Sequence, residues 1–170
     1  MLNKLFLCIS LFSLNVYSCL ELNNLNLYHE DTNTISLDFI QSFEALNKSD
    51  IKGKIYFDKP DFFKILTLEP SKTDLIVNGN DVYRTDYELN ETIKYDLLKV
   101  ESQMPAFILF KSKKNLCNFL NESKKSDFIS GIQIVNDDEK LKEISYKDQF
   151  GEPTVIRFSK ILINEKIDKK

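Results

Sequence analysis

Apolar residues with a period of two are the feature that most constrains the fold of this 170-residue chain. In the segment that begins at Ile35, the residues Ile35, Leu37 and Phe39 alternate with polar residues. That spacing places the three side chains on one face of a β-strand. Similar short segments recur toward both ends of the chain. We expect strands at 35–43, 51–59, 62–68, 75–77, 82–86, 89–95, 129–135, 141–147 and 154–163.

Turn-forming residues separate these segments and indicate that consecutive strands are antiparallel. Pro60 and Pro70 each end a strand, because proline cannot donate to the hydrogen-bond ladder. Asn78-Gly79 predicts a β-hairpin, since both residues tolerate a positive φ. Connections this short leave no room for the crossover helices of a parallel sheet.

Helix-like spacing replaces the strand pattern in two places. Apolar residues at Leu22, Leu25 and Tyr28 predict a short amphipathic helix over 20–31. Apolar clusters between about 97 and 122 predict two or three short helices. The expected fold is therefore mainly β with a helical part (α+β), in which short helices cover one face of an antiparallel sheet.

The thirteen phenylalanines raise a question that composition alone does not answer. They can form a solid core between the sheet and the helices. They can also line a cavity on the concave side of a curved sheet, with the helices as a lid. Both arrangements fit the same strand pattern.

Charge and motifs exclude several classes of function. The chain has 23 basic and 26 acidic residues, and Arg84 and Arg157 are its only arginines, so we expect no nucleic-acid binding. His29 is the only histidine, which argues against most His-based catalysis and metal sites. The sequence has no nucleophile elbow, metal-ligand cluster or phosphate loop. We therefore expect neither an enzyme nor a cofactor or metal.

The N-terminus has the pattern of a secretory signal. Lys4 precedes an apolar run over 5–16 that is too short to span a membrane, followed by Val16-Tyr17-Ser18. We predict a signal peptide over 1–18 and a single domain over 19–170. Cleavage there leaves Cys19 first, which also fits a lipoprotein signal with an acylated Cys19. Otherwise Cys19 and Cys117 can form one disulfide.

Several motifs, in this order and spacing, resemble the LolA family of periplasmic lipoprotein carriers. The matching motifs are Phe39-Ile40-Gln41, Gly53-x-Ile55-x-Phe57-x-Lys59-Pro60-x-Phe62-Phe63, Glu69-Pro70, Leu75-Ile76-Val77-Asn78-Gly79, Pro105-Ala106 and Tyr146-x-Asp148-x-x-Gly151-x-x-Thr154-x-Ile156-x-Phe158. The resemblance implies a half-open β-barrel, as in LolA and LolB, with a helical lid over an apolar cavity.

The resemblance also implies a function and partners. Members of the family hold the acyl chains of lipoproteins and carry them from the inner to the outer membrane. The implied partners are acylated lipoproteins, an inner-membrane ABC-type lipoprotein release complex and an outer-membrane lipoprotein receptor. The implied location is the periplasm, and we expect a monomer.

The resemblance implies a set of lipid- and lid-contacting residues. They are Ile55, Phe57, Lys59, Phe63, Ile65, Met104, Phe107 and Ile108. Lys59 shares a face with Ile55 and Phe57 and stands where the family has a lid-latching Arg. The alternative for Lys59 is a side chain that extends to solvent at a strand end, and for the apolar residues it is ordinary core packing.

The sequence departs from the family pattern in two places, and it leaves open two alternatives to the carrier function. Lys111–Ser130 is too short for the hairpin that the family has there, and the chain ends before the last expected strand. An acylated Cys19 predicts a membrane-anchored acceptor like LolB. A LolA-like fold also occurs in envelope-stress proteins, which predicts a sensor module with a protein partner.

Overall fold

The computed structural model describes residues 22, 25–44, 48–60, 62–101, 104–122 and 129–167. The predicted signal peptide and Cys19 lie outside the described residues. The strands are β1 (Thr34–Phe43), β2 (Ile51–Asp58), β3 (Phe62–Glu69), β4 (Thr73–Asn78), β5 (Asp81–Asp86), β6 (Glu91–Asp96), β7 (Ile129–Asp137), β8 (Lys140–Asp148) and β9 (Pro153–Ile163). The helices are the 3₁₀ helix η2 (Asn26–Tyr28) and the α-helices α1 (Leu97–Val100), α2 (Pro105–Lys111) and α3 (Lys113–Glu122).

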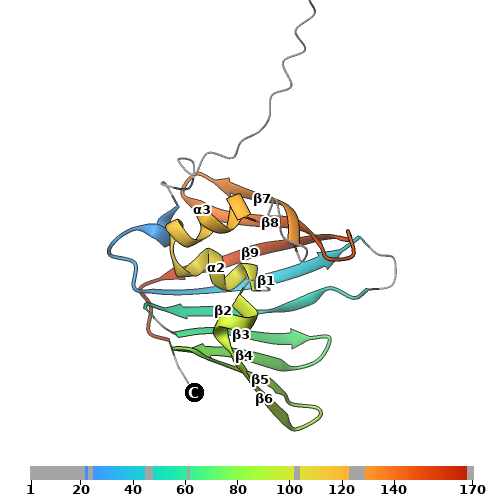
Figure 1. Ribbon diagram of the computed structural model, residues 1–170. Coiled ribbons are helices and arrows are strands. Elements are labelled where there is room, and N and C mark those ends of the chain that lie inside the picture. The colour runs from blue at the N-terminus through green and yellow to red at the C-terminus, as the bar shows by residue number, and fades with distance from the viewer. Residues whose placement is uncertain are drawn as a thin grey trace, which may run out of the picture.

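The nine strands form one antiparallel sheet in the order β6-β5-β4-β3-β2-β1-β9-β8-β7. Every neighbouring pair is antiparallel. The outer strands β6 and β7 do not pair with each other, so the sheet stays open. Helices α2 and α3 lie over one face of this sheet (Figure 1). The prediction of a half-open antiparallel sheet covered by short helices is confirmed.

Alternation along the strands determines which face is covered. In β1, the residues Ile35, Leu37 and Phe39 are buried, and in β2 the residues Ile55 and Phe57 are buried. The residues between them are more exposed. All five side chains belong to one hydrophobic cluster, which also includes residues of α2 and α3. The core therefore lies between the inner face of the sheet and the helices.

A close backbone approach explains why glycine stands at position 53. The pairing of β2 with β3 shifts register between Lys52 and Gly53. A Cβ atom on Gly53 would lie 2.2 Å from the carbonyl oxygen of Leu66 and 2.8 Å from a ring carbon of Phe39. Any larger side chain would push β3 away at this irregularity, which is a common place for glycine in a strand.

The β4–β5 hairpin agrees with the prediction, with its turn one residue later. Asn78 pairs with Asp81, so Gly79 and Asn80 form the two-residue loop. Gly79 has the positive φ, +60°, that such a loop requires.

The expected amphipathic helix over 20–31 is wrong for most of its described part. Leu25 has an extended backbone, and Asn26–Tyr28 forms a single 3₁₀ turn. The Asn26 N–H donates to the Glu139 carbonyl at 2.9 Å, and the Thr32 hydroxyl donates to the Asn26 carbonyl at 2.8 Å. These bonds tie the segment to the β7–β8 turn and replace the bonds that would continue a helix.

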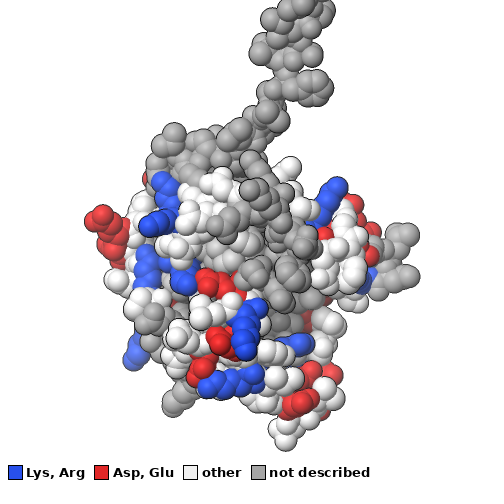
Figure 2. All heavy atoms as spheres, viewed as in Figure 1, with Lys and Arg blue, Asp and Glu red and all other residues white. Residues whose placement is uncertain are grey.

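The prediction of two or three short helices between about 97 and 122 is confirmed by α1, α2 and α3. Helix α3 occupies Lys113–Glu122, the described first part of Lys111–Ser130. In the described part of the chain, no helix has the length and apolarity needed to cross a bilayer. Charged residues of both signs are intermixed on the visible face (Figure 2).

Candidate functional site

Two phenylalanines on neighbouring strands begin the apolar site on the inner face of the sheet. Phe57 of β2 is paired directly with Phe63 of β3. Both side chains are fully buried, at 1% and 0% exposure, and their ring centroids are 6.3 Å apart in an edge-to-face arrangement. Aromatic side chains of another element can pack against such a pair in the same edge-to-face or tilted geometry.

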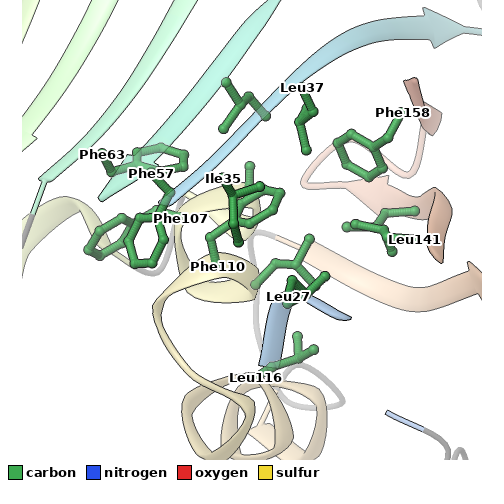
Figure 3. Close-up of a cluster of buried hydrophobic side chains, with 14 of the residues drawn as sticks. Leu27, Ile35, Leu37, Phe57, Phe63, Phe107, Phe110, Leu116, Leu141 and Phe158 are labelled. Atoms are coloured by element: carbon green, nitrogen blue, oxygen red, sulfur yellow. The ribbon is translucent and has the colours of Figure 1, made fainter. Parts of the chain in front are cut away.

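Helix α2 supplies the third element. The Phe107 ring lies 5.3 Å from the Phe63 ring, again edge to face. The Phe110 ring lies 6.4 Å from Phe57, 6.2 Å from Phe63 and 6.3 Å from Phe158 of β9. Figure 3 shows these rings directed toward one another from α2 and the sheet. We call Phe57, Phe63, Phe107, Phe110 and Phe158 the aromatic cluster.

The sequence of α2 explains why this helix lies so deep. Pro105 is compatible with its first turn, and Ala106–Phe110 are all buried. A helix that is apolar on every side is a buried helix. It ends at Lys111, because Ser112 has an extended backbone with φ −168°. The Ser112 hydroxyl then accepts from the Asn115 N–H at 3.1 Å and caps α3.

Six of the eight residues named from the sequence belong to one buried cluster or pack against it. Ile55, Phe57, Phe63, Met104 and Phe107 belong to one buried cluster, and Ile65 packs against it. Ile108 is buried but is not a member of that cluster. The role of these residues in lipid binding stays a prediction.

The prediction from the sequence missed Phe110, which contacts three other rings of the cluster. Its signal was present, because Phe110 follows Phe107 by three residues and so lies on the same helix face. In an unbroken apolar run, however, periodicity does not identify the inner face.

Lys59 lies just beyond β2, at partial exposure. Its backbone N–H donates to the Asn33 carbonyl at 2.9 Å. Burial lowers the pKa of its ammonium group, and the charge of Asp31 acts in the opposite direction. Across the described ranges, no hydrogen bond or ion pair joins this ammonium group to α1, α2 or α3. Its role as a latch stays a prediction.

At the aromatic cluster, the sheet and α2 are packed against each other. Two surface depressions in the described part of the chain lie elsewhere. One is lined by Asn26 and residues 137–140 and 142, and the other by residues 80, 81, 94–96 and 98. Neither contains a residue of the aromatic cluster.

The chemistry of this interface is apolar. Searched over the described residues, the chain shows no cluster of His, Cys, Asp and Glu that could hold a metal ion. At the edge of the interface, Lys111 forms an ion pair with Glu101 at 3.0 Å, and its ammonium group lies 5.4 Å from the Phe107 ring centroid. What this site can do is bury or expose apolar surface.

Cys117 lies in α3. It is only partly buried and is disulfide-bonded. The other two cysteines of the chain, Cys8 and Cys19, lie outside the described residues.

A family model and curated relatives that match this chain carry the same description. The family model for the outer membrane lipoprotein carrier protein LolA matches residues 30–170. An outer-membrane lipoprotein carrier protein of Francisella philomiragia subsp. philomiragia is 25% identical over 160 residues, which cover 86% of this chain and 78% of that protein. One of Francisella tularensis subsp. novicida is 24% identical over 150 residues, covering 86% and 73%.

A crystal structure of a LolA superfamily protein from Nitrosomonas europaea has a TM-score of 0.47 and 10% sequence identity to this chain. It covers 90% of this chain and 95% of its own.

Proposed function

The chain belongs to the LolA family, and on that premise we propose that it binds the acyl chains of lipoproteins and carries them from the inner to the outer membrane. The proposed location is the periplasm, and the proposed sources and receivers of cargo are an ABC-type release complex and an outer-membrane receptor. The aromatic cluster between the sheet and α2 is the observation that carries the proposal.

The energy of hydration explains why such cargo needs a carrier. Each methylene of an acyl chain in water costs about 0.8 kcal/mol, so a chain of about 15 methylenes costs on the order of 12 kcal/mol. A lipoprotein cannot cross an aqueous compartment at that cost. Its carrier needs an apolar surface and no covalent chemistry.

The structure corresponds to a closed arrangement in this proposal. Moving α2 away would expose Phe107 and Phe110, at about 2–3 kcal/mol for each side chain, and would uncover Phe57 and Phe63. An acyl chain that covers all four rings gains more than this opening costs. The same opening cost weakens net affinity and keeps binding reversible.

Within this proposal the lipid-contacting residues lie on both sides of the interface. Ile55, Phe57, Phe63 and Ile65 form the sheet side, and Met104, Phe107 and Ile108 form the helix side. Lys59 stands at the end of β2, beside the sheet side of the site. We propose no catalytic step for any of these residues.

A lipid-anchored acceptor, with an acylated Cys19, is the alternative to a carrier. Mass spectrometry of the mature N-terminus separates the two functions, since an acylated Cys19 would rule out the carrier.

A fluorescent acyl probe tests the proposal directly. We expect saturable binding to the wild-type protein and its loss in Phe63→Glu, because the new carboxylate would lie in the apolar site. The control is Phe150→Glu, at a position that is 77% exposed and outside the cluster.

Phe63 is fully buried, so a second variant guards against unfolding. Ile65→Glu changes a partly buried residue of the same strand that packs on the cluster, and it should also lose the probe. Unchanged binding in folded Ile65→Glu, or no saturable binding to the wild-type protein, would overturn the proposal.

A further inference from the structure

A hydrogen bond joins α2 to the N-terminal segment of the chain. The Tyr28 hydroxyl donates to the backbone carbonyl of Leu109 at 2.9 Å, across 81 positions of sequence. Tyr28 is the last residue of η2, and Leu109 is in the last turn of α2. Neither Tyr28 nor Leu109 is a residue of the aromatic cluster.

The Leu109 carbonyl is one that α2 cannot satisfy itself. The last four carbonyls of an α-helix have no partner within the helix. Helix α2 ends at Lys111, and the extended backbone of Ser112 ends the bonding pattern there. Leu109 is fully buried in the closed arrangement. The Tyr28 hydroxyl, in place of water, is therefore the donor to its carbonyl.

The other end of the contact is fixed on the sheet. Asn26 donates its N–H to Glu139 in the β7–β8 turn, and Thr32 bonds back to Asn26. The neighbours Leu25 and Leu27 are buried in the core. Burial also raises the pKa of the Tyr28 hydroxyl, so it remains a neutral donor at physiological pH.

We infer that Tyr28 is the latch that holds α2 over the apolar site, and that breaking its hydrogen bond with Leu109 favours the open state. The inference rests on the proposed function only for its effect on lipid. In the open state, water can reach the Leu109 carbonyl, so the loss of the hydroxyl destabilises the closed state selectively.

The test compares Tyr28→Phe with the wild-type protein in two measurements. Amide hydrogen exchange without ligand should be about fivefold faster in α2 and unchanged in β2 and β3, which is the effect of one net hydrogen bond. Affinity for the fluorescent acyl probe should rise by a similar factor, because the competent state is more populated.

Tyr146→Phe is the matched control. Tyr146 is also partly buried against the core, and burial also raises its pKa, but its hydroxyl makes no hydrogen bond with α2 in the described structure. Its removal should leave α2 exchange and probe affinity unchanged.

The outcomes separate the latch from the proposed function. Faster exchange confined to α2 supports the latch even if no variant binds the probe, in which case the carrier proposal fails alone. Unchanged α2 exchange, or an equal increase in β2 and β3, overturns the latch whatever the probe does.

Discussion

Among single residues, Phe110 connects the most parts of the apolar interface. Its ring contacts β2, β3 and β9 through Phe57, Phe63 and Phe158. Only 1% of its surface is exposed, so its removal would leave a cavity where the sheet and α2 meet. In the proposed function, these three ring contacts make Phe110 the residue that a bound acyl chain would most directly replace.

Phe110→Ala should therefore lower the free energy of unfolding by about 3–5 kcal/mol, the range for truncating a buried phenylalanine. Urea denaturation followed by circular dichroism measures this loss. Phe150→Ala, at an exposed turn position, should change stability by less than about 0.5 kcal/mol. A loss below about 1 kcal/mol in Phe110→Ala would mean that α2 contributes little to the closed structure.

Among the elements, the strands followed from the sequence and the helix faces did not. A period of two determines both the strand and its buried face, so β1, β2 and β3 and their inner residues were predictable. Ala106–Phe110 is apolar throughout and has no pattern that chooses a face. The bond between Tyr28 and Leu109 joins residues far apart in sequence, and no local signal specifies such a contact.

The burial of Tyr28, which joins η2 to α2, and of Tyr146 predicts that stability depends on pH in the alkaline range. Burial raises the pKa of Tyr28 and Tyr146 above the ordinary value of about 10. Above that pH the unfolded chain releases these protons and the folded chain keeps them, so the free energy of unfolding falls as pH rises.

Urea denaturation between about pH 9 and pH 11 measures this fall. Raised pKa values of exposed, ion-paired lysines such as Lys52 and Lys94 add to it in wild-type protein and variant alike. The difference between wild-type and Tyr28→Phe isolates Tyr28, and the variant should have the smaller slope. Equal slopes would show that Tyr28 does not keep its proton in the folded state.

At the scale of the whole molecule, the openness of the sheet explains why its inner face needs short helices to cover it. Nine strands that do not close leave the inner apolar face without a second sheet to bury it. Short helices cover that face, and α2 has only seven residues. A cover this small can be displaced by a ligand that buries more apolar surface than the cover does. In the proposed function, closed packing and lipid binding are two uses of the same surface.

The central claim is that acyl chains bind where the side chains of α2 now pack. Photocrosslinking with a fatty acid that carries a diazirine at its tail, followed by mass spectrometry of the labelled peptides, tests it most directly. We predict saturable labelling of 55–65 and of 104–110, which unlabelled fatty acid suppresses. Labelling confined to exposed apolar residues such as Leu98 and Phe150, or labelling that never saturates, would contradict the account.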